Sequence, residues 1–383
     1  PQGVYPLSRF ESLRLSTKTV QLHIGPMAAP DPPSSKSPEP TNSNGGSTPP
    51  ETSSAIVVLG AGEAGTAVLH TLNDAGLAGD VTLIEPSSYH YEQPKWVKVG
   101  TAGMKKEDTR SSKHATIPTP VTWIRERVAE IDPDVQTVTT DDDTTIGYDH
   151  LVVALGIETL WERIRDLRPN LGTHGICSVY GYSQAEKAWE MIRDFPGGRA
   201  IFTIPSTPHK GGSAPWLVLR RAASLWREHG VRDQTTLFLA VADPAHLKGD
   251  TFEELLRHRD DEDDLHVYTG YDLVNVRPEA HEAVFSVQKG ASTSRNVLPY
   301  DLLHIVPPMR PPALLEQSGL AYRDGAMRGY LEVHPESLQH KRFSNVFGVG
   351  DALGIKGVKT GERAQEQACT VVQALEHRLS KHP

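Results

Sequence analysis

The chain is poor in cysteine, with only Cys177 and Cys369 among its 383 residues. Two cysteines this far apart exclude a disulfide-stapled scaffold and a four-cysteine zinc site. They also exclude the closely spaced redox pair of glutathione-reductase-type dithiol enzymes. Cys369 lies in an apolar run with helical spacing, which predicts that its side chain is buried as a small hydrophobe.

Basic charge is also scarce, because 39 Lys and Arg residues face 48 Asp and Glu residues, a net charge of −9. This balance argues against a general nucleic-acid binder, which would need a basic surface. There is no run of about eighteen apolar residues, so no membrane-spanning helix is predicted. The histidines show neither an HExxH pair nor a Cys–His zinc spacing, so no metal site is predicted. These absences leave a globular α/β protein.

Residues 1–54 have few of the apolar residues that a folded core requires. Residues 28–54 are dominated by Pro, Ser, Thr and Gly, a composition that predicts disorder. Residues 1–27 carry Arg9, Arg14 and Lys18 among hydroxyl and aliphatic residues, which weakly resembles a mitochondrial presequence. Two interpretations stay open: a targeting segment, or a leader that precedes a natural start at Met27.

The folded part is predicted to begin at Ala55 with a β-α-β unit. Residues 55–59 form a continuous apolar run, which is typical of a strand buried on both faces of a parallel sheet. Apolar residues then recur at helical spacing as far as Gly76, a plausible helix end. A second apolar run, residues 81–84, ends in Glu85.

Three glycines in the pattern GxGxxG join the first strand to the helix. Gly60 permits the tight turn, Gly62 lets the backbone approach a pyrophosphate, and Gly65 lets the helix pack closely on the strand. The free N–H groups of the helix N-terminus attract the phosphate charge. Glu85, twenty residues beyond Gly65, can accept hydrogen bonds from ribose hydroxyls. The unit therefore predicts a dinucleotide site.

Two later segments indicate that the dinucleotide is FAD. Residues 148–156 read as a strand that ends at Gly156, and residues 345–351 as a strand that ends in Gly350 and Asp351. Both resemble elements of the flavin-containing reductases with two dinucleotide-binding domains. There the first element passes near the adenosine half of FAD, and the aspartate of the second bonds to the ribityl chain.

Lys359 precedes a predicted helix that runs to about residue 368. Its charge and the N–H groups of that helix would stabilise negative charge that develops at the flavin N1–O2 locus. Lys359 is therefore predicted to be both a cofactor-binding and a catalytic residue. The alternative is an ordinary solvated lysine.

The middle of the chain has no second glycine motif. Residues 199–204 read as a strand, but two prolines follow within four residues and no GxGxxG continuation opens the next helix, which begins near Pro215. The segment keeps an α/β outline without a pyrophosphate cradle, so an NAD(P)H donor is not expected.

Several long stretches resemble the sulfide:quinone oxidoreductase family, particularly its mitochondrial branch. They are residues 84–96, 176–179, 200–210, 303–312 and 338–351. The resemblance extends from Ala55 to the end of the chain. It implies an FAD protein that oxidises sulfide and passes two electrons to ubiquinone. It also implies a peripheral contact with one membrane face, through C-terminal amphipathic helices, at the mitochondrial inner membrane.

The chain departs from the family pattern at its cysteines. The resemblance implies a cysteine directly after the lysine matched by Lys210, where this chain has Gly211. It implies a partner cysteine later in the chain, which has no counterpart here, and a membrane-anchoring segment beyond Pro383. His209 and Lys210 flank the glycine position and are candidates for a general acid, or are simply solvated.

Three interpretations of this departure stay open. The chain is a fragment or divergent member that still oxidises sulfide, which we favour. It is a paralogue that passes electrons from another donor through FAD to quinone, or one that resembles type II NADH dehydrogenases. Or it is a flavin-binding protein without turnover.

The predicted fold class is α/β: a flavoprotein with two Rossmann-like dinucleotide-binding domains, of which the FAD domain is discontinuous. The predicted ranges are a leader at 1–54, FAD domain at 55–156, second Rossmann-like domain at 157–298, and FAD domain again at 299–383. Prolines at 307, 308, 311 and 312 would mark the crossing back.

Overall fold

The computed structural model describes residues 52–243, 245, 265–290, 292–357 and 359–380. The predicted disordered leader covers residues 1–54; residues 1–51 lie outside the described residues, and for 52–54 the prediction is wrong because they form the start of a strand. Strand β1 spans Thr52–Leu59, so it begins three residues before the predicted start at Ala55. The reason is a tertiary contact: residues 52–54 pair in parallel with residues 146–148 of strand β8.

The first sheet has seven strands in the order β5-β2-β1-β8-β7-β6, with β19 also paired to β8. β1 pairs in parallel with β2 and β8, and β19 in parallel with β8, whereas β6, β7 and β8 are antiparallel. The strands other than β1 are β2 (Val81–Ile84), β5 (Thr122–Ile124), β6 (Val128–Asp132), β7 (Thr137–Thr140), β8 (Thr145–Val153) and β19 (Val346–Gly348). Segments nearly 200 positions apart therefore complete one sheet.

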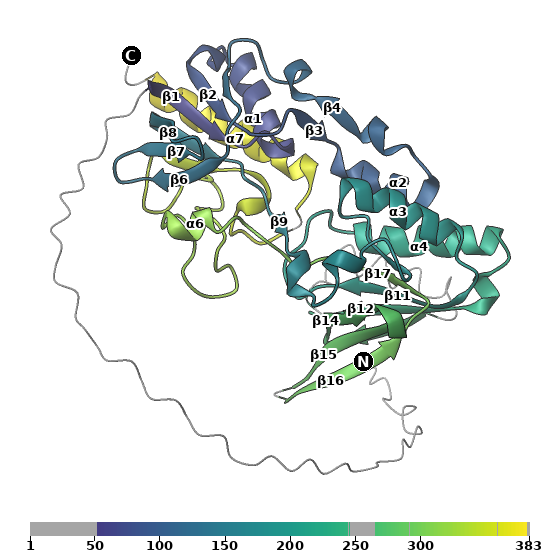
Figure 1. Ribbon diagram of the computed structural model, residues 1–383. Helices are drawn as coiled ribbons and strands as arrows, with labels where there is room; N and C mark the ends of the chain where they lie inside the picture. Colours follow the sequence, from purple (N-terminus) through teal and green to yellow (C-terminus); the bar gives the residue numbers. More distant parts are fainter. Residues whose placement is uncertain (1–51, 244, 246–264, 291, 358, 381–383) are drawn as a thin grey trace, which may run out of the picture. The chain divides into compact units, whose positions relative to one another are not determined.

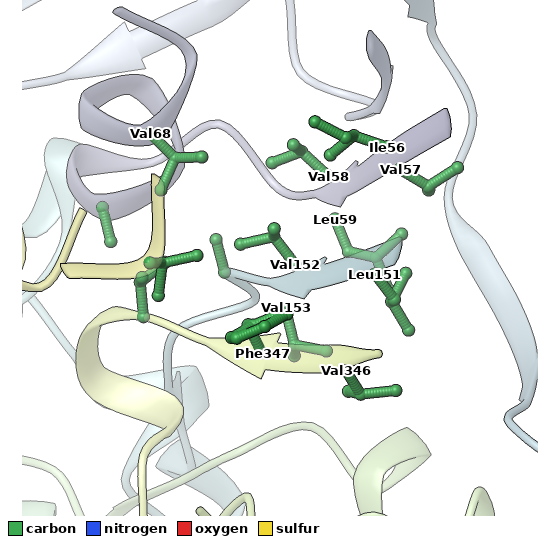
Figure 2. Packing of buried hydrophobic residues seen from close by; sticks show 14 of the residues in the cluster. Ile56, Val57, Val58, Leu59, Val68, Leu151, Val152, Val153, Val346 and Phe347 are labelled. Carbon is green, nitrogen blue, oxygen red and sulfur yellow. The ribbon is translucent and has the colours of Figure 1, made fainter. Parts of the chain in front are cut away.

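The core of this sheet forms where β1, β8 and β19 lie side by side (Figure 2). Ile56 to Leu59 have no exposed surface, as the uninterrupted apolar run predicts for a strand covered on both faces. Helix α1 (Glu63–Asp74) begins directly after the glycine loop and ends before Gly76. It packs beside helix α7 (Gly361–Leu379).

Helix α7 corrects the prediction for Cys369, which is exposed. The apolar stripe of α7 is formed by other positions: Ala364, Ala368, Val371, Val372 and Leu375 are buried. Cys369 is one residue, about 100°, away from Ala368 around the helix and so lies off that stripe. Its place in an apolar run hid the face on which it lies.

The second sheet is parallel throughout, in the order β10-β17-β11-β12-β13. Figure 1 shows its three middle strands, β17, β11 and β12, side by side. A separate antiparallel sheet, β14-β15-β16, follows. The strands are β10 (Ile176–Cys177), β11 (Gly198–Ile204), β12 (Thr235–Val241), β13 (Leu265–Thr269), β14 (Tyr271–Arg277), β15 (Glu282–Lys289), β16 (Ser292–Pro299) and β17 (Leu302–His304). Helices α2 (Trp96–Ala102), α3 (Tyr182–Arg193) and α4 (Ala214–Glu228) contact one another beside the parallel sheet (Figure 1).

Short elements complete the fold. They are β3 (Tyr89–Tyr91) paired with β4 (Arg110–Ser112), β9 (Glu158–Thr159) paired with β18 (Met309–Arg310), and helix α6 (Leu314–Gln317). β17 lies within the range predicted for the returning FAD domain yet joins the second sheet. The domain boundaries at 156/157 and 298/299 stay a prediction. Within the described ranges, no helix has the length and apolar character needed to cross a membrane.

Candidate cofactor site

The glycine loop connects β1 to α1, and its three glycines differ in what surrounds the position of a Cβ atom. Gly60 has φ +89°, and a Cβ there would lie 2.8 Å from the carbonyl oxygen of Ala154. A Cβ on Gly65 would lie 1.9 Å from the Gly60 carbonyl oxygen, so the helix packs against the turn only without a side chain. A Cβ on Gly62 would meet no described atom within 4 Å. The loop therefore closes on itself at Gly60 and Gly65 and is open at Gly62.

That opening lies at the N-terminus of α1. Gly62 is the N-cap residue, and no side chain caps the first turn. Uncapped N–H groups and the positive end of the helix dipole favour an anion at this place. The space at Gly62 supports the prediction that a pyrophosphate binds here.

Glu85 follows β2 and is held by three donors. Its Oε2 accepts a hydrogen bond from the Ala61 N–H at 2.8 Å, and its Oε1 accepts one from the Ser87 N–H at 2.7 Å. The Lys113 ammonium lies 2.7 Å from Oε2, with only 4 % of its side chain exposed. Burial lowers the pKa of Lys113, and the bond to Glu85 opposes that effect. A carboxylate has about four lone-pair positions, so one remains for a ribose hydroxyl.

Lys113 is a site residue that the sequence reasoning missed. It lies in a polar stretch with no motif, and only the fold brings it to the end of β2. Glu85 therefore also fixes the shape of the glycine loop through Ala61, in addition to its predicted contact with ribose.

The end of β19 lies against the same helix terminus. Gly350 has φ +79°, and a Cβ there would lie 2.7 Å from the Cβ of Ala64 in the first turn of α1. Its N–H donates to the Gln367 side-chain oxygen of α7 at 2.7 Å. Gly156, just after β8, has φ +66° with open space around its Cβ position. The structure thus brings Gly350 to the glycine loop, and Gly156 lies two residues beyond Ala154, whose carbonyl oxygen faces Gly60.

The side chain of Lys359 points to the backbone segment that follows β19. Its ammonium donates to the Asp351 carbonyl oxygen at 2.5 Å and to the Leu353 carbonyl oxygen at 3.4 Å. It lies 4.9 Å from the centre of the Tyr330 ring, a cation–π arrangement. Burial lowers the pKa of Lys359 to about 8, against the opposing charge of Asp351. Lys359 is therefore half-buried and hydrogen-bonded to backbone, and its role beside a flavin stays a prediction.

The Asp351 carboxylate lies near the ammonium groups of Lys359 and Lys210. Burial raises the pKa of its carboxyl, and the charges of Lys359 and Lys210 act in the opposite direction. Asp351 and Lys359 line a small depression together with Gly350 and the α7 residues Arg363 and Gln367. Three predicted cofactor-binding residues, Gly350, Asp351 and Lys359, are thus side by side.

The loop between β11 and α4 reaches the same place. Lys210 and Lys359 form a parallel β-bridge, and the Gly211 N–H donates to the Lys359 carbonyl oxygen at 3.1 Å. Burial lowers the pKa of Lys210, and nearby Asp351 opposes this effect. The position where the family resemblance implies a cysteine is therefore joined directly to the predicted flavin lysine.

Neither cysteine of the chain occupies that position. Cys177 lies on β10 with 1 % of its surface exposed, and burial raises the pKa of its thiol to about 12. Thiolate is the reactive form, so burial disfavours reaction at Cys177. Cys369 is on the exposed face of α7.

Comparison with known proteins decides the family. The model described as pyridine nucleotide-disulphide oxidoreductase matches residues 54–187. The mitochondrial sulfide:quinone oxidoreductase of Dictyostelium discoideum is 34% identical over 327 residues, which are 85% of this chain and 71% of that protein. The chain belongs to the sulfide:quinone oxidoreductase family.

Solved structures agree with the predicted fold class. The sulfide:quinone oxidoreductase of Aquifex aeolicus superimposes with a TM-score of 0.70 and 21% identity, covering 86% of this chain and 78% of that one. A chain in the structure of the Tetrahymena thermophila mitochondrial ATP synthase gives 0.75 and 20% identity, covering 87% and 81%. The predicted α/β flavoprotein fold is confirmed, and this member of the sulfide:quinone oxidoreductase family is an FAD-binding flavoprotein.

Proposed function

We propose that the protein is an FAD-dependent sulfide:quinone oxidoreductase that passes electrons from sulfide to ubiquinone. The observation that carries the proposal is the 34% identity over 85% of the chain to an enzyme of that name. The backbone contact between Lys210, Gly211 and Lys359 supports it. Through this contact, a loop of the second, parallel sheet lies beside the predicted flavin lysine.

Each predicted site residue has a task in this proposal. The N-terminus of α1, open at Gly62, would hold the pyrophosphate, and Glu85 a ribose. Asp351 would accept a hydrogen bond from the ribityl chain. Bound FAD would supply the two-electron chemistry that links a sulfur donor to a quinone.

Lys359 would act electrostatically. With a pKa of about 8 its ammonium is mostly protonated at neutral pH, although it is partly desolvated. A cation in such an environment stabilises nearby negative charge more strongly than one in water. Lys359 would therefore favour the reduced, anionic state of a flavin whose N1–O2 edge lies beside it.

The departure at Gly211 determines where the oxidised sulfur goes. Because glycine stands at position 211 and Cys177 is buried, the sulfur would leave on a second small nucleophile from solution. In the simplest balance, two hydrosulfide ions, one quinone and two protons give disulfane and quinol. Two electrons leave the sulfur atoms and two arrive on the quinone.

We extend the proposal to location and partners. The Dictyostelium relative is named as a mitochondrial protein, so we infer that this chain is mitochondrial and contacts the inner membrane peripherally, where ubiquinone is found. Subcellular fractionation checks the first part, and co-sedimentation with quinone-loaded vesicles checks the second.

The activity is tested by anaerobic reduction of the purified holoprotein. Sulfide should bleach the visible flavin absorbance, and a short-chain ubiquinone should restore it. The Cys369→Ser variant should behave as the wild type, whereas Lys359→Met should bleach more slowly. Bleaching by NADH but not by sulfide would refute the proposal in favour of an NADH dehydrogenase. A flavin that no donor reduces would refute it in favour of a binding protein.

A further inference from the structure

Tyr330 is a buried tyrosine that contacts a charged group through its ring rather than its hydroxyl. Only 4 % of its surface is exposed. The Lys359 ammonium nitrogen lies over the face of the ring, 4.9 Å from the ring centre. The hydroxyl completes no hydrogen bond with an atom of the described residues. Because a ring face carries negative charge density, Tyr330 acts on the charge of Lys359 through the ring.

Backbone pairing fixes the place of this ring. The Leu331 N–H donates to the Ala352 carbonyl oxygen at 2.9 Å, and the Gly354 N–H donates to the Leu331 carbonyl oxygen at 3.0 Å. Tyr330 is thus tied, through its neighbour, to the segment whose carbonyl oxygens accept hydrogen bonds from Lys359. The ring and the ammonium meet because both are held by the same stretch of backbone.

The ring takes the place of part of the water around the Lys359 ammonium. An ammonium group has three N–H donors, and the carbonyl oxygens of Asp351 and Leu353 accept hydrogen bonds from Lys359. Burial nevertheless disfavours the charged form of Lys359 and lowers its pKa. A ring face favours the charged form, and it does so more strongly where the cation is desolvated than at an exposed site. The contact with Tyr330 therefore opposes the effect of burial.

The charged groups around Lys359 act in both directions. The Asp351 carboxylate favours the ammonium form, whereas the Arg363 guanidinium disfavours it. The same carboxylate also acts on Lys210, so it serves two partly buried lysines. The Tyr330 ring is therefore a second source of stabilisation for the charge of Lys359, and one that does not depend on the protonation of Asp351.

We propose that Tyr330 is a positioning residue for Lys359, whose ring holds the ammonium group in place and keeps it charged. The contact itself needs no flavin, whereas its consequence for the flavin rests on the proposed function. A charged Lys359 stabilises a reduced, anionic flavin beside it, and a neutral one does not. Tyr330 therefore sets the pH range in which Lys359 has this effect.

The stability of the apoprotein tests the contact without a flavin, by urea unfolding between about pH 6 and pH 9. Because folding lowers the pKa of Lys359, the free energy of unfolding rises with pH once the folded protein begins to lose this proton. Tyr330→Leu removes the ring and should lower the proton affinity of Lys359 about tenfold, so the rise should begin about one pH unit lower. Tyr330→Phe keeps the ring and should keep the wild-type pH profile.

A phenylalanine fluorinated on its ring, in place of Tyr330, keeps the shape of the side chain if Tyr330→Leu does not fold. Fluorine withdraws negative charge from the ring face, so this variant should shift the profile in the same direction as Tyr330→Leu. A profile equal to that of Tyr330→Phe would overturn the proposal.

Two controls separate the contact from packing. In a Lys359→Met background, Tyr330→Leu should lower the stability by the same amount at every pH. Tyr322→Leu is the matched control, because it removes a ring that lies 4.9 Å from a different ammonium group, that of Lys341, and it should leave the pH profile unchanged. If Tyr330→Leu alone lowers the stability equally at every pH, Tyr330 is only structural and the proposal fails. Equal shifts in Tyr330→Leu and Tyr330→Phe would assign the effect to the hydroxyl and also overturn it.

The reduction potential of the bound flavin separates this inference from the proposed function. In the Tyr330→Leu holoprotein the midpoint potential should fall below that of the wild type at about pH 7.5, where Lys359 is mostly protonated only in the wild type. At about pH 6 the two potentials should agree, because Lys359 is mostly protonated in both. Equal potentials at every pH, with a shifted apoprotein profile, would support the contact and refute the proposed role of Lys359 beside the flavin. An unshifted apoprotein profile would refute the contact itself.

Discussion

Two glycine-to-alanine substitutions in one loop should have opposite consequences. In Gly62→Ala the new methyl group meets no described atom, and the backbone there (φ −74°, ψ −160°) suits alanine. The free energy of unfolding of the apoprotein should therefore change by less than about 0.5 kcal/mol. The methyl group does occupy the space proposed for the pyrophosphate. The Kd for FAD should rise at least about tenfold, equivalent to about 1.4 kcal/mol.

Gly65→Ala should instead lower the free energy of unfolding. Its methyl carbon would lie 1.9 Å from the Gly60 carbonyl oxygen, whereas non-bonded heavy atoms need about 3.5 Å. Because that oxygen belongs to the backbone of a tight turn, α1 must move away from β1 by more than about 1 Å. Overpacking of this kind costs about 3 kcal/mol or more.

The assay for both variants is urea unfolding of the apoprotein together with FAD titration followed by flavin fluorescence. Gly62→Ala should unfold as the wild type and bind FAD poorly, and Gly65→Ala should unfold at lower urea. Wild-type FAD affinity in Gly62→Ala would refute the assignment of the α1 N-terminus to the pyrophosphate. Equal stability of the two variants would refute the packing argument.

Two further predictions concern single side chains. The pKa of Lys359 falls from 10.5 to about 8 on folding, so the unfolded chain binds more protons between these values, and the wild-type apoprotein should gain stability as the pH rises from 8 to 10.5. Lys359→Met should lack this gain in stability, which is at most roughly 3 kcal/mol. Urea unfolding of both proteins at pH 7.5 and about 10 measures the gain. An equal change in stability with pH in the two proteins would contradict the prediction. A thiol reagent should modify Cys369 at once in the native protein and Cys177 only after unfolding; rapid modification of both would show that β10 is not buried as described.

The sequence predicted local backbone geometry most directly. The tight turn at Gly60 and the close packing at Gly65 depend on neighbours within a few residues, so the GxGxxG spacing predicted their geometry. The apolar run at Ile56 to Leu59 likewise predicted a strand covered on both faces. The register with β8, which extends β1 back to Thr52, depends on a partner about 90 positions away and was missed.

Side-chain partners across the fold were decided by tertiary structure alone. Lys113 reaches Glu85 only because the first sheet and its flanking loops fold together. The Lys210 and Lys359 loops meet across about 150 positions.

What the sequence by itself determined, then, is the β-α-β unit, the family and the cofactor. The β-α-β unit is encoded in short-range spacing that the backbone must obey wherever the unit is placed, whereas the family and the cofactor follow from the resemblance of several stretches between residues 84 and 351. What only the tertiary structure decided is that Lys113 pairs with Glu85, that the Lys210 and Lys359 loops meet, and on which face of α7 Cys369 lies. Those outcomes depend on strand order and helix rotation, which are fixed by burial summed over the whole core rather than by any local pattern.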